Sequence, residues 1–396
     1  FTGSTGFTGS TGFTGSTGLN GSTGFTGATG GAFVFNAVLW VDPNGDDATA
    51  VEGTMSKPWA KISTAVTYLR TNTATGYTVI VMPGLYDEDT TIKFNADNTA
   101  TTLYLQGGVK ISANNSMGTT PLFTIEGTAD VSITGNTPGN VWSAASTPAG
   151  LESGATILSN TTGPQSIFKI TTTTGNPDLE SFVEINNISI INLSATNGTG
   201  DVFEYANVAN TPLGLSRLSV NNCYLGHTRT GDTGFILIDA GTNARPTETI
   251  MQFRNNFMAT QNNTGCVLNL IGWDQNNEST FMELRDSILY ASATNYNQGG
   301  ADSGWIRSVT QAQGGGTAVH EWTWANNLFY AEPTAVNTDF YMWEDSGAGG
   351  ALTIQNAGVS VSNQFTVTST VSVVNGADVP LFGNQALTDP TKFNRS

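Results

Sequence analysis

The sequence predicts an all-β protein in which short strands stack in parallel as a β-helix, preceded by a triple-helical segment. Glycine occupies every third position from Gly3 to Gly30, and a short motif centred on Asn or Asp recurs six times between residues 180 and 360. Only 11% of the residues are charged, and the chain contains 46 glycines. This composition is typical of turn-rich β proteins rather than of helical enzymes.

Residues 1–30 form ten uninterrupted triplets, and Thr precedes nearly every glycine. Only a collagen-type triple helix needs one residue in three on an axis too crowded for a Cβ atom, so the period implies three chains. The alternative is a flexible Gly/Ser-rich linker, which would not keep the phase. We therefore expect a collagen-like stalk at 1–30 and a β-helical body at 31–396, with an entry strand and a capping helix at about 31–75.

The stalk contains no proline to pre-set its extended backbone, so a further constraint on its chains is expected. The threonines before the glycines would point outward in a triple helix, and we predict O-linked sugars on them. An unmodified stalk held by the body is the alternative. The candidate positions are Thr2, Thr5, Thr8, Thr11, Thr14, Thr17, Thr23, Thr26 and Thr29.

The stretch SKPWAKISTAVTYLR at 56–70 predicts the one helix of the body. Ser56 is the expected N-cap and Pro58 suits the first turn. The residues expected on one apolar face are Trp59, Ile62, Ala65, Val66 and Leu69. A single amphipathic helix ahead of many strands predicts a lid over the open end of the stack.

The recurring motif reads apolar, any, Asn or Asp, any, any, apolar, and its copies are INNISI, VNNCYL, FRNNFM, LRDSIL, WANNLF and IQNAGV. The central positions are 35, 33, 31, 40 and 30 residues apart, and most copies are followed by a loop and a further β run. Such units cannot bury an apolar face alone and must stack, each strand pairing with its counterpart about 4.8 Å away. The repeat therefore predicts a parallel β-helix.

An inward polar residue at the same bend of every coil could bond to its counterpart in the next coil. We expect such an internal ladder, although Asn-rich pairs that merely mark turns are an alternative. The predicted ladder consists of Asn187, Asn222, Asn255, Asp286, Asn326 and Asn356.

The stretch WVDPNGDDATAVEGTMSKPWAKISTAVTYLR, followed by YTVIVMPGLYDE, resembles the N-terminal cap and first coil of the pectin-lyase-like superfamily. The similarity covers residues 40–90 and includes an Asp-x-x-Gly-x-Asp turn and a Val-x-Val-x-Pro-Gly-x-Tyr strand. It implies a right-handed parallel β-helix. A collagen-like stalk joined to such a body also resembles viral and phage surface fibres and bacterial exosporium filaments, which implies an extracellular structural protein.

The superfamily includes polysaccharide lyases and hydrolases, which need clustered carboxylates for Ca²⁺ or a carboxylate pair. Strand alternation predicts two outward columns: Asn186, Asn221, Arg254, Arg285, Ala325 and Gln355, beside Glu184, Ser219, Gln252, Glu283, Thr323 and Thr353. Their only charged cluster is Arg254, Glu283 and Arg285. We interpret it as a surface ion pair, or as a contact for sugar or for another subunit. We expect no catalysis, no metal and no cofactor; a carbohydrate-active, tailspike-like enzyme presented on the stalk is the alternative function.

The formal net charge of −17 makes nucleic acid an improbable partner. No apolar run approaches the length of a membrane span. The expected partners are further copies of the chain, as a homotrimer or filament, and carbohydrate, on a virion or cell surface.

Cys223 and Cys266 are either two buried thiols or one disulfide. Among the Asn-x-Ser/Thr sequons, Asn192, Asn197, Asn262 and Asn277 fall in predicted loops and are candidate N-glycosylation sites, whereas Asn187 is expected to be inaccessible.

Overall fold

The structure is a computed structural model of the 396-residue chain. The residues it describes are 38–72, 76–95, 100–127, 129–138, 154–161, 165–172, 180–193, 202–207, 215–227, 236–239, 248–261, 268–275, 279–293, 304–313, 319–333, 340–345, 354–355, 364–367 and 373–375. The predicted stalk at 1–30 lies outside these residues, as do all nine candidate threonines. The following description concerns the body alone.

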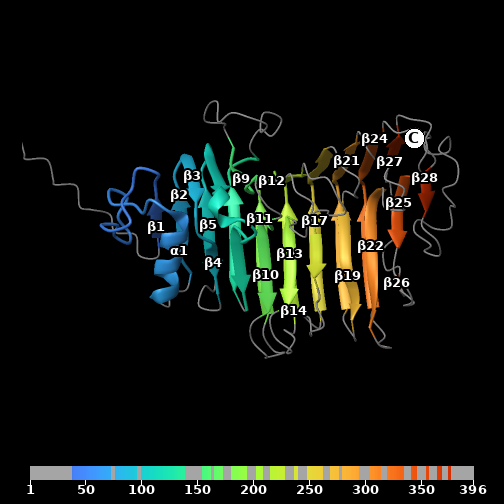
Figure 1. The fold of residues 1–396 in the computed structure, drawn as a ribbon, viewed down its shortest axis with the longest axis horizontal. Helices are drawn as coiled ribbons and strands as arrows, with labels where there is room; N and C mark the ends of the chain where they lie inside the picture. Colours follow the sequence, from blue (N-terminus) through green and yellow to red (C-terminus); the bar gives the residue numbers. More distant parts are fainter. Residues whose placement is uncertain are drawn as a thin grey trace, which may run out of the picture. The chain divides into compact units, whose positions relative to one another are not determined.

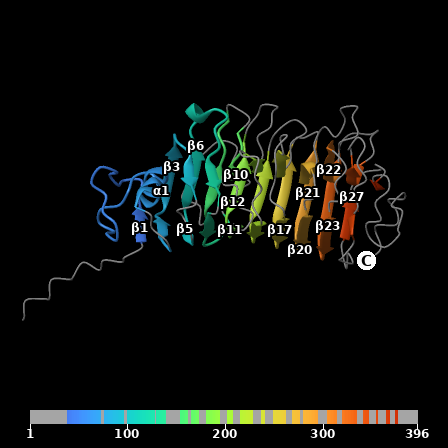
Figure 2. The same cartoon turned by 90° about the horizontal axis from the view of Figure 1, so that it is seen from below.

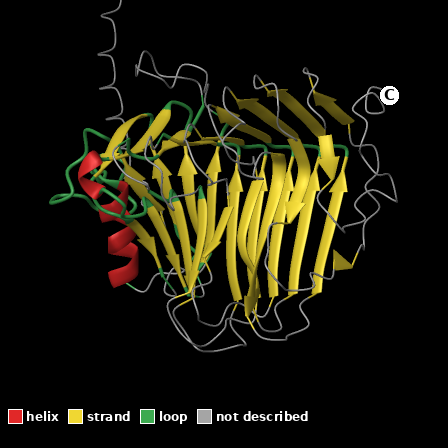
Figure 3. Ribbon diagram, turned by 45° about the vertical axis from the view of Figure 1, so that its right-hand side comes forward, coloured by secondary structure: helices red, strands yellow, loops and turns green. Residues whose placement is uncertain are grey.

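The described part of the body consists almost entirely of parallel strands in three sheets, here called A, B and C (Figure 3). Sheet A contains β1 (Val38–Val41), β2 (Thr78–Val81), β5 (Thr101–Leu105), β8 (Asp130–Gly135), β11 (Glu180–Asn186), β14 (Leu215–Asn221), β17 (Glu248–Arg254), β20 (Ser279–Arg285), β23 (Val319–Ala325) and β26 (Ile354–Gln355). Sheet B contains β3 (Gly84–Glu88), β6 (Val109–Ala113), β9 (Thr156–Leu158), β12 (Ser189–Asn192), β15 (Tyr224–His227), β18 (Phe257–Gln261), β21 (Ile288–Ala293), β24 (Leu328–Pro333) and β27 (Gln364–Val367).

Sheet C contains β4 (Ile92–Phe94), β7 (Phe123–Glu126), β10 (Phe168–Thr172), β13 (Phe203–Asn207), β16 (Ile236–Asp239), β19 (Leu268–Gln275), β22 (Gly304–Gln313), β25 (Phe340–Asp345) and β28 (Val373–Asn375). From β2 onward the chain visits A, B and C in turn, so each coil adds one strand to every sheet. The strands of each sheet follow one another in sequence order (Figures 1 and 2). The fold is therefore all-β and parallel β-helix-like, as the repeat predicts.

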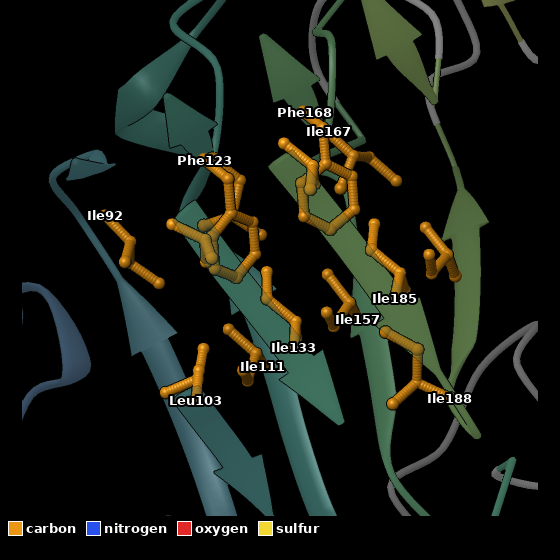
Figure 4. Packing of buried hydrophobic residues seen from close by; sticks show 14 of the residues in the cluster. Ile92, Leu103, Ile111, Phe123, Ile133, Ile157, Ile167, Phe168, Ile185 and Ile188 are labelled. Atoms are coloured by element: carbon orange, nitrogen blue, oxygen red, sulfur yellow. The ribbon is translucent and has the colours of Figure 1, made fainter. Parts of the chain in front are cut away.

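The core lies between the three sheets, and in most strands whose burial is described every second side chain fills it, as in β5 and β6. On the A and B strands, the apolar residues that flank the motif's central position are fully buried in the first four copies: Ile185, Ile190, Val220, Leu225, Phe253, Met258, Leu284 and Leu289. Sheet C contributes Phe123 and Phe168 (Figure 4), whose ring centroids lie 4.8 Å apart, and Phe203, whose ring stacks on Phe168 at 5.4 Å. Burying one such ring contributes about 1.5–3 kcal/mol.

Helix α1 (Ile62–Thr71) contacts β1, β2, β3 and β4 at one end of the stack (Figure 1). Ile62, Ala65, Val66 and Leu69 are buried as predicted, but the helix begins later than expected and Ser56 is not its cap. Trp59 forms a parallel bridge with Val41, which holds that segment extended. The η1 turn (Asn115–Met117) is the other described helical element.

Carboxylates from other segments cap the N-terminus of α1. Its own N-cap residue, Lys61, makes no side-chain cap bond. Glu88 accepts hydrogen bonds from the amides of Ile62 at 2.8 Å and Ser63 at 3.3 Å, and it is only 1% exposed. Asp47 accepts from the amide of Ala60 at 2.7 Å. Both carboxylates lie where the helix leaves amides without intrahelical partners, and where the helix dipole favours negative charge.

The bends between sheets A and B correct the predicted ladder. At each bend from β11 to β24, one residue adopts a left-handed backbone with φ between 52° and 57°. These bend residues are Asn187, Asn222, Asn255, Asp286 and Asn326; the first is half-buried and the other four are exposed. The prediction that they point inward is wrong, because the left-handed residue interrupts the strand alternation on which it was based. Asn356, the sixth expected member, lies outside the described residues.

The buried positions belong to the residue after each bend residue: Ile188, Cys223, Asn256, Ser287 and Asn327, here called the inner bend residues. The Asn256 side chain accepts from the amide of Cys223 at 2.9 Å and donates to the carbonyl of Val220 at 2.8 Å. Asn327 makes the same pair of contacts one bend further on, to the amide of Ser287 at 3.0 Å and the carbonyl of Leu284 at 2.9 Å. The inward contacts between coils are therefore made one residue later than expected, and they join side chains to backbone groups.

The bend residues also bond from coil to coil, on the solvent side. Asn326 donates from Nδ2 to Oδ1 of Asp286 at 3.2 Å, and Asn255 donates in the same way to Asn222. Asn and Asp tolerate the left-handed conformation better than other residues with a Cβ atom. This preference explains why the motif centre is always Asn or Asp.

Candidate functional site

The outer face of sheet A carries the polar columns that the sequence predicts. Register pairs Asn186 with Asn221, Asn221 with Arg254, Arg254 with Arg285, and Arg285 with Ala325. The second column, Glu184, Ser219, Gln252, Glu283 and Thr323, is likewise aligned. The last predicted member of the first column is wrong, because Gln355 pairs with Glu321 instead of Ala325. Thr353 lies outside the described residues.

Arg254, Glu283 and Arg285 meet as predicted, on the neighbouring strands β17 and β20. Arg254 donates to Oε2 of Glu283 from Nε at 3.1 Å and from Nη2 at 2.5 Å, while Arg285 donates to Oε1 from Nε. Gln252 also donates to Oε2 at 3.2 Å. The Glu283 side chain is 17% exposed, whereas the two arginine side chains are about half exposed, at 50% and 47%. The cluster therefore presents two guanidinium groups to solvent around one satisfied carboxylate.

Neutral side chains extend this polar surface across the preceding strands. Asn221 donates to Oδ1 of Asn186 at 3.0 Å, and Asn186 donates to the hydroxyl of Thr134 at 3.3 Å. On the same face, the guanidinium of Arg217 lies 5.9 Å from the ring centroid of Phe182. Amides, hydroxyls and guanidinium groups in a row on a parallel sheet offer donors and acceptors to a polar ligand lying across the coils.

Glu184 and Glu283, the two carboxylates of the predicted column, are too far apart to act as a glycosidase pair. Glu184 and Glu283 occupy the same column but stand three strands apart, which at about 4.8 Å per strand is about 14 Å. Paired glycosidase carboxylates are about 5–9.5 Å apart. Within the described ranges, no group of three or more His, Cys, Asp or Glu residues is placed to hold a metal ion.

The candidate N-glycosylation sites have mixed outcomes. Asn192 is wrong as a candidate, because it is 1% exposed, accepts from the Ser159 hydroxyl at 3.0 Å and donates to the carbonyl of Gln165 at 3.2 Å. Asn197, Asn262 and Asn277 lie outside the described residues. Asn187, expected to be inaccessible, is a half-buried bend residue.

For Cys223, which the structure describes, the buried thiol is the alternative that holds, and the disulfide is not formed. Cys223 is a free thiol, 3% exposed, and burial raises its pKa to about 12. Its Sγ lies 3.2 Å from the carbonyl oxygen of Asn221. The thiol therefore behaves as a small core residue rather than a nucleophile. Cys266 lies outside the described residues.

Two groups of polar residues were missed by the sequence reasoning. The inner bend residues Asn256, Ser287 and Asn327 stand directly beside the motif's central position, so the Asn-Asn doublets carried the signal. Glu88 follows the strand of the first coil with nothing in its neighbourhood to mark it as a helix cap 26 residues away.

Comparison of the chain with protein-family models, with curated proteins and with solved structures finds no match. In the described part of the chain, none of the helices has both the length and the apolar character that crossing a membrane requires.

Proposed function

We propose that the chain is a structural or adhesive component of a trimeric extracellular fibre on a virion or cell surface. In this proposal residues 1–30 form a collagen-like stalk, and the body is a right-handed, pectin-lyase-like β-helix without catalytic activity. The observation that carries the proposal is the unbroken glycine period from Gly3 to Gly30, because each glycine of a triple helix packs against two other chains.

The body supports a mechanical or adhesive role. Its coils stack in register, with parallel pairing from β1 to β26 along sheet A. Each coil covers the apolar face of its neighbour, so the stack can project a surface over many coils without a separate core for each. The polar outer face of sheet A, centred on Arg254, Glu283 and Arg285, is then the candidate contact for sugar or for another subunit.

Sedimentation equilibrium of the full chain tests the trimer. The expected mass is three times the 41.5 kDa of one chain. Gly15→Ala places a methyl group on the crowded axis and should lower the thermal midpoint of the trimer, whereas the neighbouring Ser16→Ala, at an outward position, should not. A monomeric full-length chain would overturn the proposal.

O-linked sugars on the stalk threonines are part of the same proposal. They would restrict the backbone of a proline-free repeat by packing along it. Intact-mass analysis of the native protein should show a series of hexose increments on the peptide covering residues 1–30. A peptide at its bare polypeptide mass would remove the sugars from the proposal and leave the body to hold the stalk together.

A carbohydrate-active enzyme on a stalk is the second candidate, favoured by the row of polar side chains along sheet A. Incubation with acidic and neutral polysaccharides separates the two functions. We expect retention of the polysaccharide without cleavage. New reducing ends or unsaturated uronides, lost in Glu283→Gln, would favour the enzyme instead.

A further inference from the structure

Over β15, β18 and β21 the described outward positions of sheet B carry no charge, whereas nearer the helical end the same face presents Asp87 and Lys110. The outward positions on β15, β18 and β21 are Tyr224, Phe257, Ile288 and Tyr290, with the buried Gly226 and Ala259 between them; these six residues are here called the apolar strip. Ile288 is 36% exposed, and Tyr224, Phe257 and Tyr290 are half-buried. Aligned apolar side chains on an outer sheet face are a candidate contact for another apolar surface.

The aromatic rings of the strip stack on one another. Tyr224 and Phe257 have centroids 5.4 Å apart at an interplanar angle of 12°, and Phe257 and Tyr290 are 6.2 Å apart at 28°. A Cβ atom on Gly226 would lie 2.8 Å from Cε1 of Tyr224, so the ring lies over the glycine. Because the rings cover each other's faces, they turn edges rather than faces outward, which suits apolar packing better than the stacking of a sugar ring.

The other two faces carry charges. Sheet A presents Arg254 and Glu283, and sheet C presents the pair Lys169–Glu204 with Nζ and Oε1 2.7 Å apart. Burial raises the pKa of Tyr224 to about 12, so this phenol adds no charge near neutral pH. With a formal net charge of −17, copies of the chain repel one another, and contact through an uncharged surface brings no further like charges together. The apolar strip therefore matches another apolar strip better than it matches either charged face.

We infer that the apolar strip packs around a threefold axis against the same strip of two further copies of this chain. The inference rests on the proposed trimer, because a triple-helical stalk holds three bodies parallel and at the same height. Each residue of the strip then meets its own counterparts, as a cyclic arrangement with the strip at the axis requires.

The size of the strip explains why the stalk is needed. Three strands about 4.8 Å apart span about 15 Å, and the half-buried Leu328 on β24 continues the strip by one strand. The strip is still smaller than the ~800 Å² per partner of a standard interface. Free copies would not associate through so small a surface. A stalk that joins them raises the effective concentration to the millimolar range, and the strip then sets the orientation of the bodies.

Cysteine cross-linking of the full chain tests the inference. Ile288→Cys places one thiol per chain in the strip, and Glu184→Cys places a matched exposed thiol on sheet A. A short bismaleimide should join two of the three chains in the Ile288→Cys trimer, leaving the third single, and should leave the Glu184→Cys trimer largely unlinked. The unsubstituted chain gives the background from Cys223 and Cys266.

Sedimentation of the same samples separates failure of the inference from failure of the proposed function. A trimer in which Ile288→Cys cross-links no better than Glu184→Cys would remove the strip from the interface and leave the fibre proposal standing. A monomer would overturn both. As a second variant, Ile288→Lys brings three ammonium groups together at the axis and should lower the thermal midpoint of trimer dissociation, whereas Glu184→Lys should not; equal midpoints would also contradict the inference.

Discussion

At the helical end of the body, buried backbone amides bond to carboxylates, whereas at the repeating bends they bond to neutral side chains. Glu88 accepts from the amides of Ile62 and Ser63. Asn256 accepts from the amide of Cys223 and also donates to the carbonyl of Val220. Both arrangements satisfy backbone groups that the packing has removed from water, but only the first depends on a charge.

The difference follows from repetition. A carboxylate is favourable at a helix N-terminus, which occurs once, because the helix dipole and several free amides converge there. A carboxylate at every bend would place like charges about 4.8 Å apart along the stack, and their repulsion would raise their pKa values and destabilise the fold. An amide has both a donor and an acceptor and carries no charge, so it can be repeated from coil to coil.

The largest effect is expected from removing an inner bend amide. Asn256→Leu leaves the amide of Cys223 and the carbonyl of Val220 buried without their partner, at about 1–3 kcal/mol of unfolding free energy for each group. Denaturant unfolding followed by circular dichroism measures the loss. The adjacent Asn255→Gly is the control, since this exposed bend residue keeps its left-handed backbone as glycine. Equal losses in both variants would contradict the assignment of the inner bend residues.

A smaller effect tests the left-handed backbone of the bends. At Asn187, where φ is 57°, a Cβ atom without a polar side chain costs about 1–2 kcal/mol. We therefore expect Asn187→Gly to be more stable than Asn187→Ala, the reverse of the order within an ordinary strand or helix. Comparison of the two denaturation midpoints checks the sign. An alanine variant that equals or exceeds the glycine variant would show that the bend relaxes.

The sequence was sufficient for the stacking of the coils because the motif is repeated. The buried pairs Val220 and Leu225, and Phe253 and Met258, recur with the same spacing, so their register could be predicted without a structure. The neighbouring outward residues followed from strand alternation, which brought Arg254, Glu283 and Arg285 together.

Prediction failed where the backbone leaves the regular strand. A single left-handed residue at each bend shifts the inward position from Asn255 to Asn256. A prediction based on the alternation of side chains along a strand cannot anticipate that shift. The pairing of Gln355 with Glu321 depends on loop lengths, which the motif does not specify. Glu88 could not be recognised as a cap because its contact with Ile62 depends on how the first coil folds beneath the helix.

The pH dependence of stability offers the finest test of the charged helical end. Burial raises the pKa of Glu88 above its ordinary value of 4.5, despite the opposing effect of hydrogen bonds from Ser63 and Ile62. The folded state therefore binds a proton at Glu88 more readily than the unfolded state does. The contribution of Glu88 to the free energy of unfolding should therefore fall as the pH rises from about 4.5 through the pKa of Glu88 in the folded state. The glutamine side chain of Glu88→Gln does not titrate, so the wild type should lose stability relative to this variant over that pH range.

The neighbouring Asp89 supplies a control of opposite sign. A hydrogen bond from Lys61 lowers the pKa of Asp89 below 3.8, so its stabilising contribution is lost only as the pH falls below that value. The free energy of unfolding of the wild type should therefore increase relative to that of Asp89→Asn as the pH rises toward about 4. The increase should be small because the Lys61 and Asp89 side chains are both exposed. Urea denaturation of all three proteins between pH 3 and pH 8 measures both differences. A wild-type minus Glu88→Gln difference that stays constant with pH would mean that the buried carboxyl at the helix N-terminus does not titrate differently in the folded state.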